Sequence, residues 1–302
     1  MGYALVFSGQ GLQHAGMLPW LERDATVIEV ERLLGSHWRD RLADPDWAGN
    51  NRHAQVLLTG LAIAAWRQLV SHLPPPAVIA GYSVGELAAF SAAGVFDAAN
   101  ALTVAAARAE AMDKAAAVQA ATGLLGVSGT TPEALARWCE RFGLQLAIRI
   151  GPGSAVVGGL QPALHSAAEA ASAQGMRCTA LNIAMASHTH WMQPATEEFG
   201  RVLSGVVMCR PSHLLLSGAI GRGRVRSGEE AREALAIQIS RTVRWDDCMD
   251  AIAAQRVDAV LEVGPGQALA RMWMERCPEV PVRSADEFRS APAIVKWLLT
   301  CA

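Results

Sequence analysis

The segment Gly81-Tyr82-Ser83-Val84-Gly85 constrains the fold of this chain more than any other stretch. The apolar run 77–80 follows three prolines and predicts a short buried strand, because proline disfavours helix and leaves an extended entry. Residues 84–93 are rich in Ala, Leu and Glu and stop at Gly94, which predicts a helix with a C-terminal glycine. A serine between two glycines at such a strand-to-helix turn matches the nucleophile elbow pattern G-x-S-x-G.

The spacing of this pattern has a physical cause. The turn forces strained backbone angles at Ser83, and side chains two residues to either side would collide, so Gly81 and Gly85 remove the collision. The hydroxyl is then held at the N-terminus of a helix, where free N–H groups and the helix dipole favour negative charge. The pattern therefore predicts Ser83 as a nucleophile. The alternative is a glycine-rich turn in which the serine only caps the helix.

The composition limits the classes of function that are open to this chain. Its 302 residues fit one large domain or two smaller ones, and 51% of them are apolar, enough for a substantial core. The net charge of −2 argues against a nucleic-acid partner, and the absence of a long uncharged apolar stretch argues against a membrane span. Six cysteines without a C-x-x-C pair, and an N-terminus without signal-peptide features, predict a cytoplasmic location. No metal-ligand spacing is present, so no metal site is predicted.

Strands and helices alternate along most of the chain, which predicts an α/β fold with a mostly parallel sheet covered on both faces. Residues 123–185 break the pattern with the order β-α-β-β-α-β of a ferredoxin-like unit. We therefore predict an α/β-hydrolase-like large domain at 1–122 and 186–302, with an inserted ferredoxin-like subdomain at 123–185. The predicted strands that bear on the site span 4–7, 77–80, 178–183, 214–217 and 259–263, and the helices span 54–69, 84–93 and 98–118.

A serine nucleophile needs a base, because a free hydroxyl is weakly nucleophilic at neutral pH. His188 and His190 lie where the predicted subdomain returns to the main sheet, a natural position for a cleft. His188 is the predicted base, and a surface or capping histidine is the alternative. No Asp precedes a late histidine in the order Ser, Asp, His, which argues against an ordinary esterase. Arg108 stands among alanines in the helix 98–118, which leaves room for a ligand or simply for solvent.

Seven motifs, in order, resemble those of the malonyl-CoA:acyl-carrier-protein transacylase family over nearly the whole chain. Each motif is weak alone, but seven in the family's order are specific. They are Ser8-Gly9-Gln10-Gly11 (G-Q-G loop), Gln55 in 55–58 (Q-P-A-L helix), 81–86 (G-H-S-x-G-E elbow), Arg108 with Met112 (R-x-x-x-M), Ser187-His188 with Met192 (S-H-x-x-x-M), Gln238 seven residues before Trp245 (Q-x-x-x-P-V-x-W) and 262–266 (E-V-G-P-G).

The resemblance implies an S-malonyltransferase in which Ser83 attacks the thioester of malonyl-CoA and becomes malonylated. It implies that His188 takes the serine proton and later activates the incoming thiol. Neutral carbonyl groups near Gln238 are expected to orient this histidine, so no triad Asp is required. The backbone N–H groups of Gln10 and Val84 are the expected oxyanion hole.

The resemblance also implies that Arg108 binds the malonyl carboxylate through a two-pronged contact. Such a pair would exclude neutral acetyl groups, since the arginine would be left unpaired. Gln10, Met112 and Gln238 are expected as further substrate-binding residues. The alternative for Arg108 is a solvent-facing residue that pairs with Asp or Glu.

Three positions depart from the family pattern. Tyr82 replaces the histidine before the nucleophile, Ile150 stands where asparagine is frequent, and Thr242 replaces a proline. Within the family the chain looks closest to the malonyl transferase (epsilon) subunit of bacterial malonate decarboxylase. Alternatives are a housekeeping fatty-acid or polyketide malonyl transferase, a serine hydrolase with the same elbow, or an inert acyl-binding subunit.

The expected partner is an acyl carrier protein, either an ordinary one or one with a CoA-like prosthetic group, as the decarboxylase resemblance implies. Malonyl-CoA is expected as substrate, with no permanently bound cofactor. The basic stretch 221–226 can meet the acidic face of a carrier protein or the CoA phosphates, and an exposed solvated loop is the alternative.

Overall fold

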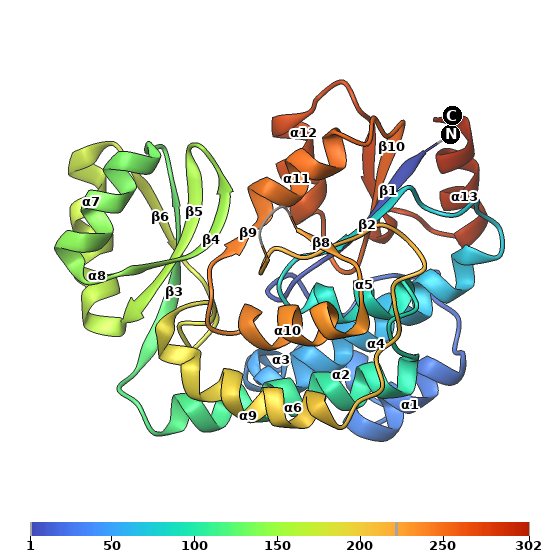
Figure 1. The fold of residues 1–302 in the computed structure, drawn as a ribbon, viewed down its shortest axis with the longest axis horizontal. Helices are drawn as coiled ribbons and strands as arrows, with labels where there is room; N and C mark the ends of the chain where they lie inside the picture. Colours follow the sequence, from blue (N-terminus) through green and yellow to red (C-terminus); the bar gives the residue numbers. More distant parts are fainter. Residues whose placement is uncertain (1, 221–222, 302) are drawn as a thin grey trace.

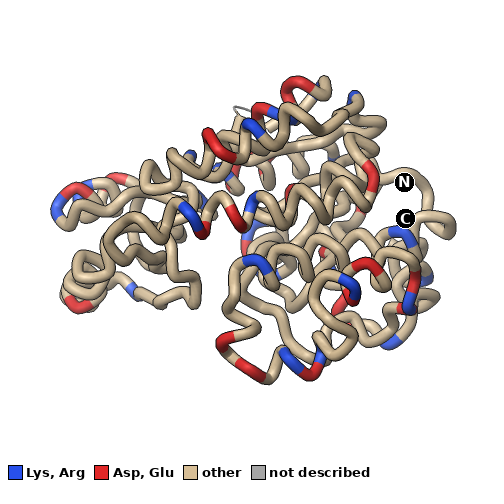
Figure 2. Tube along the Cα trace, turned by 90° about the horizontal axis from the view of Figure 1, so that it is seen from below, with Lys and Arg blue, Asp and Glu red and all other residues tan. Residues whose placement is uncertain are grey.

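The computed structural model describes residues 2–220 and 223–301. The chain has an α/β fold with two mixed sheets, one mostly parallel and one mostly antiparallel (Figure 1). Of the basic stretch 221–226, positions 221–222 lie outside the described residues, and Arg224–Val225 form strand β8. Acidic and basic residues are interspersed along the trace (Figure 2). No helix among the described residues combines the length and the apolar character needed to cross a membrane.

The larger sheet has the strand order β11-β10-β1-β2-β7-β8. All neighbouring pairs are parallel except β7 and β8, so the predicted mostly parallel sheet is confirmed. Its strands are β1 (Tyr3–Phe7), β2 (Val78–Gly81), β7 (Leu215–Leu216), β8 (Arg224–Val225), β10 (Ala259–Val263) and β11 (Val282–Ser284).

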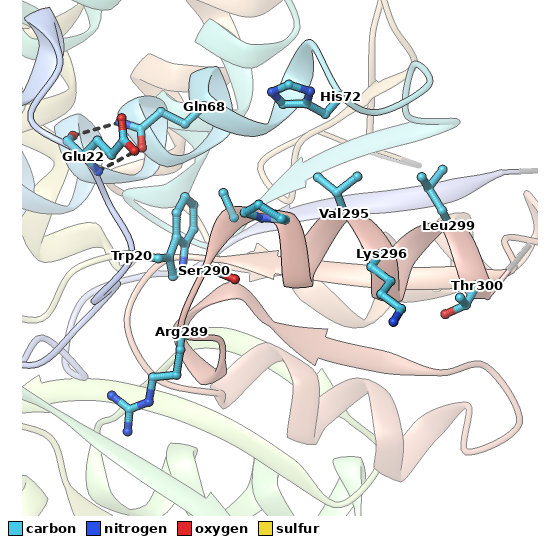
Figure 3. Close-up of a pocket in the computed structure, with 12 residues that line it drawn as sticks. Trp20, Glu22, Gln68, His72, Arg289, Ser290, Val295, Lys296, Leu299 and Thr300 are labelled. Atoms are coloured by element: carbon cyan, nitrogen blue, oxygen red, sulfur yellow. Dashed lines mark hydrogen bonds between the residues drawn. The ribbon is translucent and has the colours of Figure 1, made fainter.

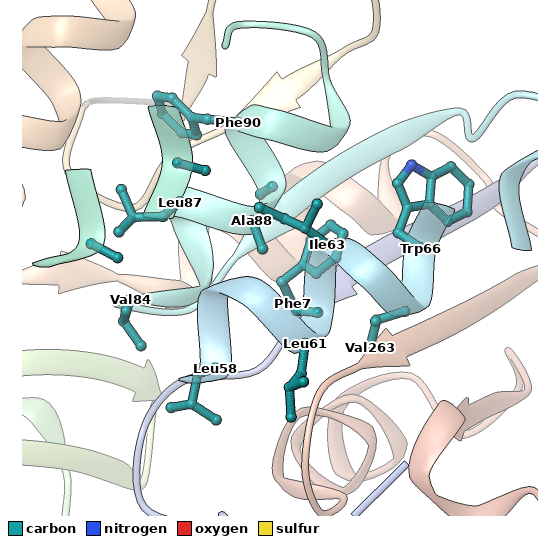
Figure 4. Packing of buried hydrophobic residues seen from close by; sticks show 14 of the residues in the cluster. Phe7, Leu58, Leu61, Ile63, Trp66, Val84, Leu87, Ala88, Phe90 and Val263 are labelled. Carbon is teal, nitrogen blue, oxygen red and sulfur yellow. The ribbon is translucent and has the colours of Figure 1, made fainter. Parts of the chain in front are cut away.

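Both faces of this sheet are covered by helices, as in mostly parallel sheets generally. Successive side chains of a strand point to opposite faces, so alternate residues of each strand enter different core clusters. On β1, Leu5 and Phe7 belong to the core cluster that includes helices α4 (Asn51–Val70) and α5 (Gly85–Ala92). Figure 4 shows this packing around Phe7, Val84 and Leu87. The alternate residues Ala4 and Val6 belong to a second cluster with α11 (Trp245–Ala253) and α12 (Ala268–Arg276).

The second sheet has the strand order β6-β3-β5-β4-β9. Its pairs are antiparallel except the short parallel pair of β4 and β9. Helices α7 and α8 lie beside it, at one end of the molecule (Figure 1). Its elements are β3 (Thr122–Ser128), α7 (Pro132–Phe142), β4 (Gln145–Gly151), β5 (Ser154–Leu160), α8 (Gln161–Ala171), the 3₁₀ turn Ser172–Gln174, β6 (Arg177–Ala180) and β9 (Val243–Arg244).

Strand β9 belongs to the second sheet but comes from a later part of the chain than the other four strands of that sheet. Ile148 and Arg149 of β4 pair with Val243 and Arg244, which lie outside the predicted subdomain 123–185. The Thr242 hydroxyl donates to the Leu146 carbonyl at 2.7 Å, a bond that the proline expected at 242 could not make. The second sheet is therefore completed by a strand from beyond its own segment.

In the view of Figure 1 most of the remaining helices lie below the larger sheet, and α13 lies beside it near the two termini. Asp24 and Asp97 cap two of these helices, α1 and α6, since both side chains accept hydrogen bonds from the first turn of their helix. These helices are α1 (Ala25–Leu34), α2 (Trp38–Arg41), α3 (Pro45–Gly49), α6 (Ala98–Ala117), α9 (Gln193–Ser204), α10 (Gly228–Gln238) and α13 (Ala291–Thr300), with 3₁₀ turns at His190–Met192 and Ala285–Glu287.

Two predicted strands are shorter than expected. The strand predicted over 178–183 ends at Ala180, after which the chain leaves the sheet and Ile183 packs into the hydrophobic core. The strand predicted over 214–217 is confined to Leu215–Leu216, because Ser217 and Gly218 bond instead to the buried carboxylate of Glu86.

Candidate active site

The turn between β2 and α5 holds Ser83 in the left-handed region, with φ of +55°. A side chain at Gly81 would overlap the backbone of Gly85 and Glu86, and one at Gly85 would overlap the carbonyl of Phe7. Neither position has room for a side chain, so both must be glycine, as the elbow pattern predicts. The Ser83 side chain is consequently presented at the N-terminus of α5.

The structure brings His188 to Ser83. The Ser83 Oγ lies 2.8 Å from His188 Nε2, although the residues are far apart in sequence. His188 Nδ1 lies 2.7 Å from the backbone carbonyl oxygen of Gln238. A carbonyl only accepts, so Nδ1 carries the proton and Nε2 is left to accept the Ser83 proton.

His188 is held rigidly in the interior. It is 1% exposed, its φ is +64°, and its own N–H donates to the Ile239 carbonyl at 2.7 Å. Burial and the charge of Arg108 lower the pKa of His188 to about 3, against the hydrogen bond to Gln238, which raises it. The imidazole is therefore neutral at neutral pH. The alternative of a surface histidine is excluded for His188, whereas His190 is exposed.

Arg108 is not the solvent-facing residue of the alternative reading. It is 3% exposed and donates to Gln55 Oε1 at 2.8 Å and to Gln238 Oε1 at 3.0 Å. Both partners are neutral amides, and the other N–H groups of the guanidinium have no partner among the described residues. Burial lowers the pKa of Arg108 to about 10, so the side chain stays charged at neutral pH.

Gln238 touches every other member of this group. Its backbone carbonyl accepts from His188, its side-chain oxygen accepts from Arg108, and its side-chain Nε2 donates to the Ser83 carbonyl at 3.1 Å. The last residue of α10 thus ties the predicted nucleophile, base and cation into one cluster.

Met112 is connected to Arg108 through Gln55. The Gln55 amide that faces Arg108 also lies 3.4 Å from the Met112 sulfur and donates to Asn51 Oδ1 at 2.8 Å. Met112 is buried, and its sulfur contacts Gln55. Its direct contact with a substrate stays a prediction. Gln55 and Asn51 were not among the predicted site residues, although Gln55 lies in one of the seven motifs.

The loop after β1 lies against the elbow. Phe7 pairs with Gly81, the Tyr82 N–H donates to the Phe7 carbonyl at 3.0 Å, and a side chain at Gly9 would collide with Tyr82. The backbone N–H groups of Gln10 and Val84 have no hydrogen-bond partner within the described residues. Both groups are therefore free to donate to a ligand. The oxyanion hole at these two groups stays a prediction.

Tyr82, the departure next to the nucleophile, has its side chain packed in the interior. Its ring packs edge-on against Trp245, with ring centroids 5.5 Å apart. Burial raises the pKa of the Tyr82 phenol, so it remains neutral. The substitution therefore adds an aromatic contact and leaves the site without a second imidazole.

Glu86 is a site neighbour that sequence reasoning passed over, although it ends the elbow motif. It has no exposed surface, accepts the Ser217 hydroxyl at 2.9 and 3.0 Å, and accepts the Gly218 N–H at 2.9 Å. Burial raises the pKa of Glu86 to about 7, against the hydrogen bonds and the charge of Arg108, which lower it. Glu86, three residues after Ser83 in the elbow motif, is thus a buried carboxylic acid that changes its protonation near neutral pH.

An open cavity of about 570 Å³ reaches His188 from the side of β9. Arg241 and Arg244 lie on its wall, with Thr189, His190 and Ser240. A larger cavity of about 790 Å³ lies elsewhere, between the end of α4 and α13, and Trp20, His72 and Val295 line it (Figure 3). None of the predicted site residues lines this second cavity, so the larger hollow is separate from the Ser83 cluster.

A family model described as "Acyl transferase domain" matches residues 4–292, nearly the whole chain. The chain belongs to the acyl transferase domain family. It is 32% identical over 297 residues to the malonyl CoA-acyl carrier protein transacylase of Mycobacterium tuberculosis, covering 93% of this chain and 95% of that one. It is 28% identical over 312 residues to the transacylase of the same name from Haemophilus influenzae, covering 98% and 99%.

Solved acyl transferase structures agree with this fold. The MCAT of Mycobacterium tuberculosis superposes with a TM-score of 0.87 at 30% identity, covering 99% of both chains. A complex of a type II PKS acyl-carrier protein with its malonyl-transacylase matches with a TM-score of 0.89 at 26% identity, covering 98% of this chain and 99% of that one. These relatives support the malonyl transacylase resemblance, and none of the relatives described here is a malonate decarboxylase subunit.

Proposed function

We propose that this acyl transferase moves a malonyl group from malonyl-CoA to the thiol of a carrier protein through a malonyl ester on Ser83. Ser83 Oγ attacks the thioester carbonyl while His188 Nε2 takes its proton, and CoA leaves as the thiol with that proton. The carrier thiol then gives its proton to His188 and attacks the ester carbonyl; the bond to Ser83 Oγ breaks, His188 returns the proton to Oγ, and the carrier thioester is released.

The observation that carries this proposal is the charged Arg108 held beside the Ser83–His188 pair by neutral amides. A buried cation with unused donors is a strong site for a carboxylate, and a malonyl group ends in one. A neutral acetyl group would leave the guanidinium unpaired in the interior, which disfavours it.

The backbone N–H groups of Gln10 and Val84 are proposed to stabilise the oxyanion that forms on the thioester carbonyl. The Gln238 carbonyl keeps the proton of His188 on Nδ1 and stabilises the ring when it becomes charged. This neutral acceptor takes the position that a triad carboxylate has in other serine enzymes. The scheme needs no cofactor beyond malonyl-CoA as substrate.

We propose an acyl carrier protein as the acceptor, since relatives across the full length of the chain carry that acceptor in their names. The carrier subunit of a malonate decarboxylase, with its CoA-like prosthetic group, is the second candidate. Tyr82 is the observation that favours it, because the substitution departs from the transacylase motif.

The domain organisation is proposed as two parts, a large catalytic domain at 1–122 and 186–302 and a ferredoxin-like subdomain at 123–185. The element order β3-α7-β4-β5-α8-β6 supports the subdomain, and the mostly parallel larger sheet with its elbow supports the α/β-hydrolase-like description of the other part.

Incubation with malonyl-CoA labelled in the malonyl group tests the function. We expect label on a Ser83 peptide after acid quench, no label in Ser83→Ala, and chase of the label onto an acyl carrier protein. Absence of a covalent adduct overturns the transferase scheme. Label that is lost to water at the same rate with and without carrier indicates a hydrolase, and chase onto a decarboxylase carrier alone selects the second acceptor.

A further inference from the structure

The Ser83 cluster contains a buried carboxyl group, Glu86, that the transfer scheme does not use, and Arg108 carries the opposite charge in the same cluster. Glu86 has no exposed surface, and Arg108 is almost as deeply buried. Each lowers the cost of the other's charge, since Arg108 lowers the pKa of Glu86 and Glu86 raises that of Arg108. With both groups ionised, the interior here is close to neutral.

A malonyl carboxylate at Arg108 would change this balance. The site would then hold two negative charges and one positive charge out of contact with water. An uncompensated buried charge is strongly unfavourable, and a buried group responds by changing its protonation state. Glu86 is suited to this response, because burial already raises its pKa to about 7.

We propose that Glu86 takes up a proton when the malonyl carboxylate binds Arg108, so that charge balance in the acyl site is restored by this residue. The inference rests on the proposed function, because it assigns the malonyl carboxylate to Arg108. Glu86 is a positioning residue in this scheme: it acts through Arg108 and does not touch the reacting atoms.

The groups that face Glu86 come from several elements. Ser217 and Gly218 at the end of β7 donate to it, and Gln238 of α10 and Arg108 of α6 favour its charged form. The Cys248 thiol of α11 lies close enough for the Glu86 charge to raise its pKa, and it stays protonated. None of these groups other than Glu86 changes its proton near neutral pH.

His188 is the competing proton acceptor in the same cluster. Its pKa of about 3 would have to rise by several units before it took the proton. A protonated His188 could no longer accept the Ser83 proton, so uptake there would block the transfer. Glu86 can be protonated without this loss, because the Ser83 hydroxyl bonds to His188 and not to Glu86.

Titration calorimetry on Ser83→Ala, which cannot be acylated, measures the proton directly. Malonyl-CoA and acetyl-CoA are titrated at pH 8 in buffers of different ionisation enthalpy. We expect uptake approaching one proton for malonyl-CoA and close to none for acetyl-CoA, which carries the same phosphates. Uptake also predicts that the affinity for malonyl-CoA falls with rising pH, by up to about tenfold per pH unit.

The double variant Ser83→Ala/Glu86→Gln should lose the uptake and the pH dependence while it retains binding. Ser83→Ala/Glu262→Gln is the matched control. Glu262 is also buried with a raised pKa, but it accepts hydrogen bonds from Ser8 and from the start of α12. None of these groups bonds to Arg108. This control should keep the uptake.

Infrared difference spectra of Ser83→Ala labelled with ¹³C-glutamate give a second readout that does not depend on the folding of Glu86→Gln. A protonated carboxylic acid band that appears with malonyl-CoA and not with acetyl-CoA supports the proposal, and its absence overturns it. Preference for malonyl-CoA without net proton uptake also overturns the Glu86 inference alone. Equal binding of the two thioesters overturns the proposed function instead.

Discussion

Arg108 and Arg149 illustrate two ways in which this fold holds an arginine. Arg149 on β4 is 40% exposed in its side chain and bonds to two carboxylates, Asp246 at 2.6 and 2.9 Å and Asp247 at 2.9 Å. Arg108 is buried and bonds only to two amide oxygens. The first is paired directly with carboxylates, whereas no carboxylate of the described residues is in hydrogen-bond contact with the second, which is proposed to pair with an incoming anion. The chemistry of the partners, more than burial, separates a structural arginine from a binding one.

Replacement of the buried arginine should have the largest effect. Arg108→Ala is expected to raise the free energy of activation for malonyl transfer, as derived from kcat/KM, by about 2–5 kcal/mol. The reason is that the malonyl carboxylate loses its charged partner. Arg149→Ala, measured in the same assay with labelled malonyl-CoA, should retain most of the activity. Equal losses in the two variants would remove the distinction between them.

A smaller loss is expected when Arg108 is made to resemble Arg149. Gln55→Glu places a carboxylate where the neutral amide lies, so the guanidinium acquires a partner that competes with malonyl. We expect KM for malonyl-CoA to rise about ten- to a hundredfold, on the basis of about 1.5–3 kcal/mol for a hydrogen bond to a charged group. Thermal unfolding should show that the variant is folded. An unchanged KM would mean that the neutrality of the partner is unimportant.

The exposed arginine should contribute modestly to stability. Arg149→Ala is expected to reduce the free energy of unfolding by about 0.2–1 kcal/mol, since its ion pairs are partly exposed to solvent. The difference from the unsubstituted protein, measured by urea denaturation, should shrink in high salt because screening weakens such pairs. A salt-independent difference would point to lost packing of the side-chain stem instead.

The smallest expected effect is on the base. The charge of Arg108 is the second cause, after burial, of the low pKa of His188. In Arg108→Gln the pKa of His188 should rise part of the way toward its ordinary value, while Arg149→Gln should leave it unchanged. Nuclear magnetic resonance of ¹⁵N-labelled histidine measures this directly.

The sign of the corresponding stability effect follows from the same shift. The folded pKa of His188 lies below the ordinary value of 6.5, so its contribution to stability is present above pH 6.5 and is lost as the pH falls toward 3. Arg108→Gln should therefore reduce the acid-induced loss of stability that comes from this residue.

Local signals in the sequence were sufficient for much of the fold. The strand at 259–263 and the start of the helix at 98 were predicted where the structure has them, because each depends on neighbouring residues. The two-residue strands β8 and β9 were not predicted, since two residues carry no alternation. Helix α13 was also not predicted.

The site was predictable in its residue types but not in its contacts. Family motifs pointed to Ser83, His188, Arg108 and Gln238, and the structure brings the four together. The alanines around Arg108 did not reveal its burial, because small neighbours are compatible with both solvent and interior. The acceptor for His188 is a backbone carbonyl, a group that every residue has, so composition alone could not identify it.

The parallel pairing of β4 with β9 limits how freely this molecule can be recombined. The strand that completes the second sheet begins five residues after Gln238, whose carbonyl orients the base. In a chimaera that exchanged only residues 123–185 with a relative, the new β4 would have to pair with β9 of this chain. It would also have to accept the Thr242 hydrogen bond that Leu146 accepts here. The two sheets are therefore distinct in architecture but cannot be exchanged independently, because the strand that connects them lies close to His188, the proposed base.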